Sequence, residues 1–236
     1  KNCGYRVSTK AYCWDKATAS AALERAFLGL DREYVDVFML HEQESIHTLR
    51  GHREALDYLN EQKAKGRIGL VGVSTHYAGC VRAAAVFGGV DVIHPLINVE
   101  GIGIQDGTRA DMEAAIAYAH GLGVGIFAMK PLGGGHLIAD NERALRYLLD
   151  APWADSIAVG MQSEKEIDAN AAMRARCGNY PIGSAISWCR TIARAAGNAW
   201  NFAARAHCPS GMGMPWWMRI SACCAAIARG CARSSR

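Results

Sequence analysis

Two polar side chains stand where short apolar segments end. Lys10 closes the stretch "YRVSTK", and His41 closes "VDVFMLH". A buried Lys lowers the pKa of an acidic hydroxyl group beside it, and a neutral His can orient a carbonyl group for attack. Together the two residues predict acid–base chemistry on a carbonyl compound. Taken singly, the Lys could extend to solvent and the His could be satisfied by the backbone.

Short β-branched segments alternate with helical periodicity as far as residue 173. Most of the strand segments are continuously apolar, as in parallel strands that are covered on both faces. An apolar stripe of helical spacing marks the first helix, within residues 19–30. The predicted strands are residues 6–10, 35–40, 68–73, 91–95, 124–129 and 156–159. The predicted later helices are residues 53–65, 78–87, 110–120, 141–150 and 165–172.

This alternation makes six βα units of about 30 residues and leaves two architectures, an open doubly wound sheet or a closed eight-unit barrel. A doubly wound sheet would need a glycine-rich G-x-G-x-x-G turn after an early strand, and none occurs there. We therefore predict an α/β fold, a partial (β/α)8 TIM barrel. The chain opens on a strand without an initial Met, so we expect its strands to be the third to eighth of the barrel.

Five stretches resemble the aldo-keto reductases, in order and at suitable spacing. They are "VSTK", "DVFMLH", "KGRIGLVGVSTH", "GVGIFAMKPLGGG" and "SIAVGMQSEKEIDAN". The resemblance covers residues 1 to about 173 and is strongest to a bacterial branch that carries a ferredoxin-like extension. It implies a barrel enzyme that reduces aldehydes or ketones with NADP.

In that family a Tyr acts as general acid, helped by an Asp, a Lys and a His. Lys10 and His41 match the Lys and the His. The Asp and the Tyr belong to the first two units of the barrel, and neither Tyr5 nor Tyr12 stands where the Tyr is needed. We therefore expect this fragment to be inactive by itself.

The resemblance also implies cofactor-binding residues. Ser74, His94 and Asn98 match the positions that bind the nicotinamide amide, although His94 replaces the usual Gln. The turn after the fifth predicted strand, where backbone amides and a cation can meet the pyrophosphate, holds Lys130, Pro131, Leu132 and Gly133. The adenosine end is matched by Gly160, Met161, Gln162, Ser163, Glu166 and Asn170. Only Lys165 provides a cation there, so both NADP and NAD remain open.

The composition changes after Met173. Residues 1–173 hold 17 Lys and Arg against 22 Asp and Glu, whereas the nine charged residues that follow are all Arg. We predict a barrel domain of residues 1–173 and an irregular or helical tail of residues 174–236. Six of the nine cysteines lie in this tail, at spacings that fit no zinc or disulfide framework. These are Cys177, Cys189, Cys208, Cys223, Cys224 and Cys231.

A slip of the reading frame between about Met173 and Gly183 explains the tail. In the shifted frame, a codon ending in T before an Ala codon reads as Cys. Two runs of such pairs then give C-x2-C-x2-C-x3-C, the spacing that ligates a [4Fe–4S] cluster. In the first run, the residues that precede Ala are Ile192, Ala195, Asn198 and Phe202. In the second run, they are Ser221, Cys224, Ile227 and Cys231. The clusters would belong to the parent protein only, and no metal site is predicted in this chain.

The sequence thus predicts an NAD(P)H-dependent carbonyl reductase with a small-molecule substrate, located in the cytoplasm. No membrane or nucleic-acid partner is expected, and the oligomeric state is open. The first alternative is a barrel subunit that senses nucleotide without catalysis. The second is nucleic-acid binding through the basic tail.

Overall fold

The structure is a computed structural model that describes residues 6–176. It divides the chain into two compact units. The first unit is Ser8–Ala158, and the second includes Val7 and the residues from Val159 onward. Most of the predicted tail, residues 177–236, lies outside the described residues, so the domain boundary after residue 173 stays a prediction. Within residues 6–176 no helix is both long enough and apolar enough to cross a membrane.

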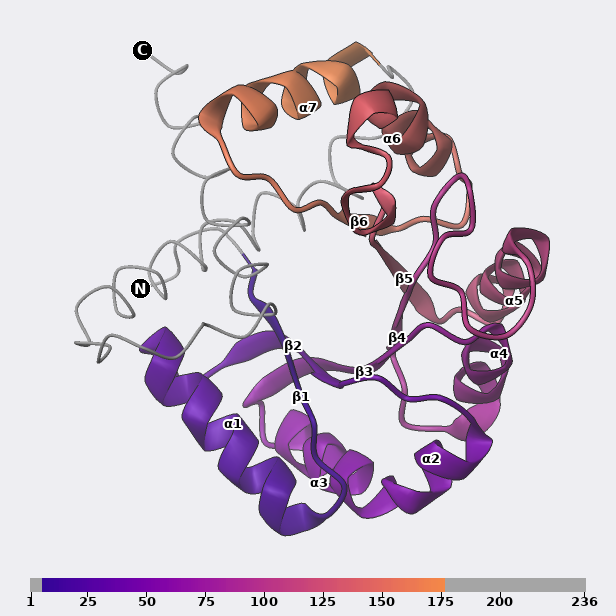
Figure 1. Ribbon diagram of the computed structural model, residues 1–236. Coiled ribbons are helices and arrows are strands. Elements are labelled where there is room, and N and C mark those ends of the chain that lie inside the picture. The colour runs from indigo at the N-terminus through magenta and orange to yellow at the C-terminus, as the bar shows by residue number, and fades with distance from the viewer. Residues whose placement is uncertain (1–5, 177–236) are drawn as a thin grey trace, which may run out of the picture. The chain divides into compact units, whose positions relative to one another are not determined.

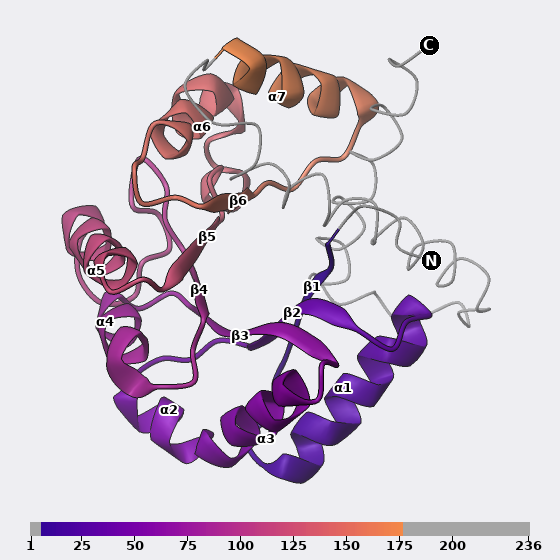
Figure 2. The ribbon, with the colours of Figure 1, turned by 180° about the vertical axis from the view of Figure 1, so that it is seen from behind.

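The first unit contains a curled parallel sheet in which the strands follow one another in chain order (Figure 1). The strands are β1 (Ser8–Ala11), β2 (Val35–Leu40), β3 (Ile68–Thr75), β4 (Val92–Pro95), β5 (Gly125–Met129) and β6 (Ser156–Ala158). Both views place the connecting helices outside the curl (Figures 1 and 2). The predicted α/β class and partial barrel are therefore confirmed.

Six α-helices and two short 3-10 turns connect these strands, and a seventh α-helix lies in the second unit. The helices of the first unit are α1 (Lys16–Leu30), α2 (Ile46–Gly51), α3 (Arg53–Ala64), α4 (Ala78–Phe87), α5 (Arg109–Gly121) and α6 (Asn141–Leu149). The 3-10 turns are η1 (Gly133–Gly135) and η2 (Ile138–Asp140). Among residues 159–176 of the second unit, the helix is α7 (Glu164–Arg176).

Reciprocal side-chain caps fix the starts of α1, α2 and α5. Asp15 and Thr18 form such a capping box at α1, and Thr108 and Asp111 form one at α5. Ser45 and Thr48 do the same at α2, a helix that the sequence analysis did not predict. Its six residues are too few to show a helical period. Its cap, Ser followed three residues later by Thr, lacks the Glu or Gln of the usual signature.

The strand register divides the side chains between two faces of the sheet, because successive side chains of a strand point to opposite sides. One face, the apolar face, is fully buried and includes Phe38, Leu40, Val71, Val73, Ile93 and Ile126, all 0% exposed. The other face holds buried apolar side chains such as Val37 together with polar ones. On this face Lys10 pairs with Met39, and Ser74 pairs with His94. The helices cover the apolar face, so the polar set lies on the inside of the curl.

Gly72 lies on this inner face and allows the strands to approach closely. A Cβ atom at this position would lie 2.5 Å from both Cγ1 and the carbonyl oxygen of Val92, and 3.0 Å from Cγ of Met39. The carbonyl oxygen belongs to the backbone and cannot move aside. Gly72 therefore permits the tight contact of β3 with β4 below Ser74.

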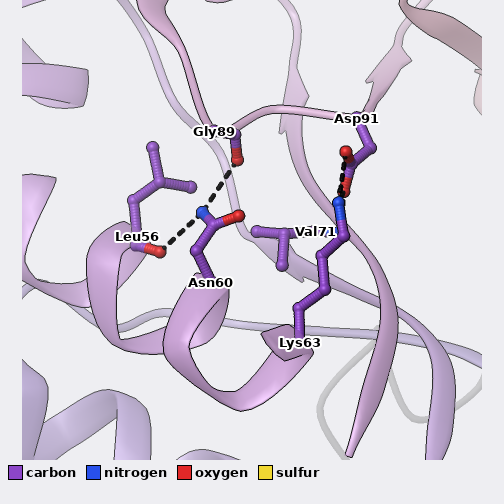
Figure 3. Close-up of polar contacts among 6 residues, drawn as sticks. All are labelled: Leu56, Asn60, Lys63, Val71, Gly89 and Asp91. Atoms are coloured by element: carbon purple, nitrogen blue, oxygen red, sulfur yellow. Dashed lines mark hydrogen bonds and ion pairs between the residues drawn. The ribbon is translucent and has the colours of Figure 1, made fainter. Parts of the chain in front are cut away.

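Asp91, in the chain that enters β4, links α3 to β3 (Figure 3). Its carboxylate accepts hydrogen bonds from the Lys63 ammonium at 2.6 and 2.7 Å and from the Val71 amide at 2.8 Å. The Asn60 side chain adds a second link, donating to the carbonyl oxygens of Leu56 and Gly89. The end of α3 is thus bonded both to β3 and to the chain that enters β4.

We predict that Asp91→Ala lowers the free energy of unfolding by about 2–3 kcal/mol. The substitution leaves the buried Val71 amide and the half-buried Lys63 ammonium without their acceptor. Urea denaturation of the two chains measures the difference. The control is Asp57→Ala, which breaks an exposed ion pair with Arg53 and should change the stability by less than about 1 kcal/mol. Equal effects of the two substitutions would contradict this role for Asp91.

Candidate active site

Lys10 and His41 lie on neighbouring strands at the carboxyl edge of the sheet. β1 begins two residues later than predicted and ends at Ala11, so Lys10 is its penultimate residue. Lys10 pairs with Met39, and His41 follows β2 two residues further along the same face. The His41 amide donates a hydrogen bond of 2.9 Å to the carbonyl oxygen of Ala11. The structure therefore brings the two predicted catalytic residues to one region of the inner face.

The Lys10 side chain is half-buried, and its surroundings disfavour the charged form of its amine. Burial lowers its pKa to about 8, with a further contribution from the positive charge of Lys130, while Glu42 acts in the opposite direction. No hydrogen bond or ion pair of Lys10 is found among residues 6–176. A Lys of this kind favours the anionic form of a group placed beside it.

His41 is 8% exposed and bears no charge at neutral pH. Burial, followed by the positive charge of Lys10, lowers its pKa to about 4. Its Nδ1 atom lies 2.9 Å from Oγ of Ser74. The ring of Tyr12 lies against the imidazole, with 4.5 Å between the ring centres.

Tyr12 and Glu42 belong to the site but were not among the predicted residues. The Tyr12 hydroxyl donates a hydrogen bond to the Glu42 carboxylate, and burial together with this bond raises the pKa of Tyr12 to about 12. Burial alone would raise the pKa of Glu42, but the Tyr12 hydroxyl and the surrounding positive charges lower it. A simple signal could have found Tyr12, which follows Lys10 by two residues and so shares its face.

His76 and Lys130 bring a second cation to the same region. The Lys130 ammonium lies 3.2 Å from Nε2 of His76. An ammonium group can only donate, so this nitrogen of His76 accepts. Burial and the charge of Lys130 lower the pKa of His76 to about 4. His76 was not among the predicted site residues, although its spacing of two from Ser74 again indicates the shared face.

Two backbone amides of the turn after β5 donate hydrogen bonds within the turn itself. Lys130 has a positive φ of 57°, and Pro131 and Leu132 lead into the glycines of η1. The amides of Gly133 and Gly135 donate to the carbonyl oxygens of Lys130 and Leu132. The Lys130 side chain is therefore the clearest anion-binding group that this turn provides.

The three residues predicted to bind the nicotinamide amide already have protein partners. Ser74 lies within β3 rather than after it, and its Oγ also accepts from the Glu42 amide at 3.0 Å. His94 donates from Nδ1 to the carbonyl oxygen of Phe127 and stacks on that ring. Asn98 bonds the amide and the carbonyl oxygen of Ile102 at 2.9 Å each. Each side chain nevertheless keeps some capacity, such as Nε2 of His94 and the second amide hydrogen of Asn98.

The predicted adenosine-binding residues lie in the second unit. Gly160, Met161 and Gln162 precede α7, and Asn170 lies within it. Oγ of Ser163 accepts from the Glu166 amide at 3.2 Å, and the Glu166 carboxylate accepts from the Gln162 amide at 2.7 Å. These bonds fix the start of α7, where a helix N-terminus favours negative charge.

We predict that His41 makes the stability of the chain fall in mild acid. The pKa of His41 is 6.5 when unperturbed and about 4 in the fold, so between these values the unfolded chain binds more protons. Stability is therefore complete above pH 6.5 and decreases as the pH falls towards 4. Urea denaturation at pH 7 and pH 5 should show about 2 kcal/mol less loss in His41→Gln than in the unaltered chain. The exposed His47→Gln serves as control, and an unchanged pH dependence in His41→Gln would count against the burial of a neutral imidazole.

Known proteins share this sequence pattern and fold. The model of the aldo/keto reductase family matches residues 1–143. An aldo-keto reductase structure from Pseudomonas aeruginosa is 19% identical, with a TM-score of 0.60 over 72% of this chain and 64% of that one. Aldo-keto reductase AKR11C1 from Bacillus halodurans, in its holo form, is 17% identical, with a TM-score of 0.60 over 75% of this chain and 67% of that one.

At these identities the structural likeness shows the fold alone. The chain spans 64% and 66% of the length of two Pseudomonas aeruginosa structures, and no curated protein sequence matches it. The match to the family model, in contrast, extends over more than half of the 236 residues. The chain belongs to the aldo/keto reductase family.

Proposed function

We propose that the inner face at the carboxyl edge of the sheet is the active site of an NAD(P)H-dependent carbonyl reductase, with Lys10 and His41 as its catalytic residues. The observation that carries the proposal is the arrangement of a half-buried Lys, a neutral His and a second Lys beside one another. Family membership supports an oxidoreductase. The substrate would be a small aldehyde or ketone, and the enzyme would act in the cytoplasm.

The chemistry of the site suits a carbonyl oxygen that gains negative charge. A nicotinamide cofactor supplies the hydride for such a reduction. His41 can offer a hydrogen bond to the carbonyl oxygen, because it is neutral and keeps a ring hydrogen. Lys10 and Lys130 provide the positive charge that stabilises an alkoxide.

The residues present fit the phosphate-bearing part of a nicotinamide cofactor. Lys130 is the cation of the turn after β5, and the charge of Lys10 adds to the positive potential of the region. We propose that this turn, through Lys130, Pro131, Leu132 and Gly133, holds the pyrophosphate. Ser74, His94 and Asn98 would contact the nicotinamide amide with the capacity that their protein partners leave. Gly160, Met161, Ser163, Glu166 and Asn170 would bind the adenosine part of NADP or NAD.

Tyr12 does not replace the general acid of the family. Its hydroxyl donates to Glu42, and its raised pKa of about 12 makes it a poor proton donor. No other residue of the chain matches the family Tyr or Asp. We therefore propose that the 236-residue chain alone binds the cofactor without turning over a carbonyl substrate.

Cofactor binding tests this function directly. The change in NADPH fluorescence on titration with the chain should give a dissociation constant, and Lys130→Ala should weaken binding about tenfold, since one charged contact of about 1.4 kcal/mol is lost. Lys65→Ala, which removes an exposed Lys before β3, should leave binding unchanged. An unaltered chain that binds neither NADPH nor NADH would refute the proposed function. Steady reduction of an aldehyde by this chain would refute its inactivity.

For the tail we propose an out-of-frame ferredoxin-like extension. The support is sequence alone, since residues 177–236 lie outside the described part of the chain. In frame, the parent protein would ligate two [4Fe–4S] clusters through C-x2-C-x2-C-x3-C runs. The present tail would ligate none.

The gene sequence tests the slip of frame. We predict that the codons of Ser221, Cys224, Ile227 and Cys231 end in T, because only then does the shifted frame read Cys at each following Ala. The codons of Ile192, Ala195, Asn198 and Phe202 should do the same. Any other third base in the first group of four removes that cluster and defeats the explanation.

A further inference from the structure

A closed ring of contacts surrounds His41. The Tyr12 ring lies on the imidazole, and the Tyr12 hydroxyl donates to the Glu42 carboxylate. The Glu42 amide donates to Oγ of Ser74 at 3.0 Å, and this oxygen lies 2.9 Å from Nδ1 of His41. The four residues come from the ends of β1 and β2 and from β3, so the ring joins three strands.

The hydrogen bonds of Ser74 determine which nitrogen of His41 carries the hydrogen. Ser74 is 0% exposed, and its hydroxyl has one hydrogen to donate. Its oxygen already accepts from Glu42, and among residues 6–176 the one acceptor found for its hydrogen is Nδ1 of His41. Buried hydroxyl groups are satisfied in folded proteins, so Ser74 donates to Nδ1 and the hydrogen of the imidazole lies on Nε2.

The backbone of Glu42 shows how firmly this ring is held. Glu42 has a φ of 48°, in the left-handed region that residues with a Cβ atom adopt at a cost. Its amide bonds to Ser74 and its side chain bonds to Tyr12, and both contacts are made from this conformation. Strain of this kind persists only where surrounding contacts enforce it, and it concentrates at functional sites.

We infer that Tyr12 and Glu42 are positioning residues, which together with Ser74 hold the His41 ring in place with its hydrogen on Nε2. Tyr12 covers the ring, and Glu42 anchors Tyr12 through its side chain and Ser74 through its amide. The role in catalysis rests on the proposed function, where an Nε2–H group is the donor that a carbonyl oxygen requires. The arrangement itself does not depend on any cofactor.

Among residues 6–176, the charged and titratable groups around His41 are Lys10 on β1, Tyr12 after β1, Glu42 after β2, His76 after β3, His94 on β4 and Lys130 after β5. Removing Tyr12 changes none of these charges directly but admits water to the ring. Since burial is the main cause of the low pKa of His41, exposure should raise it. Trp14, an equally exposed aromatic residue of the same loop (55% against 58% for Tyr12), provides the matched control.

Nuclear magnetic resonance of the full chain labelled with [15N]histidine tests the inference. Correlations between ring nitrogens and ring hydrogens distinguish the two neutral tautomers from imidazolium, and the signals that disappear in His41→Gln identify His41. We expect a single neutral form at pH 7 with the hydrogen on Nε2 and a pKa of about 4. Ser74→Ala should shift the Nδ1 signal, because this nitrogen loses its donor.

Three variants distinguish a role of Tyr12 and Glu42 in positioning His41 from a general role in stabilising the fold. Tyr12→Leu should raise the pKa of His41 by at least one unit, whereas Trp14→Leu should not move it and Glu42→Gln, which keeps an acceptor for Tyr12, should retain the Nε2–H form. The other histidines within residues 6–176 report whether the fold is intact. A His41 with its hydrogen on Nδ1, or equal pKa values in Tyr12→Leu and Trp14→Leu, would overturn the inference. Because no cofactor is needed, failure here is distinct from failure to bind NADPH.

Discussion

The parallel register of β1, β2 and β3 is the constraint on which the site depends. Pairing of Lys10 with Met39 and of Met39 with Gly72 places these residues on one face. Two residues further along each strand, the same alternation yields Tyr12, His41 and Ser74. A shift of any strand by one residue would turn its side chains to the helical side of the sheet. Chemistry at this edge therefore follows from backbone pairing that the apolar face stabilises.

The electrostatic character of the site follows from crowding these groups together under partial burial. Lys10 and Lys130 lie near the carboxylate of Glu42. His41 and His76 add no positive charge at neutral pH, because burial lowers the pKa of each to about 4. The result is a positively charged region of the inner face with one acidic group, suited to an anionic ligand or to developing negative charge. Glu42, two residues after β2, and Lys130, directly after β5, adopt the left-handed conformation, with φ of 48° and 57°. This conformation costs about 1–2 kcal/mol for each residue.

The architecture could be predicted from sequence because it depends on repetition. Apolar segments at intervals of about 30 residues predict parallel strands even where their exact ends are uncertain from sequence. β1, for example, starts two residues later than predicted, and the fold is the same. Lys10 and His41 were predictable because they end apolar segments. Helix α2 was not, since one and a half turns carry no period.

The contacts within the site were harder to predict. Tyr12, Glu42 and His76 are ordinary polar residues of loops, and they acquire a role only when pairing between distant strands sets them beside Lys10, His41 and Lys130. Spacing of two residues indicates the shared face for Tyr12 and His76. For Glu42 no such rule applies, because its direction comes from the left-handed backbone. Likewise, no sequence pattern indicates that Asn98 forms hydrogen bonds with Ile102 that close its own loop.

The titration of Lys10 tests most directly whether these side chains share one site. Its pKa can be measured from the 13Cε signal of lysine-labelled chain, with Lys10→Arg to identify the signal. If Lys10 and Lys130 share one site, the pKa of Lys10 is about 8 and rises in Lys130→Met, because a neighbouring positive charge is removed. A Lys10 that titrates near 10.5 and does not respond to Lys130→Met would show that the two side chains do not share a site.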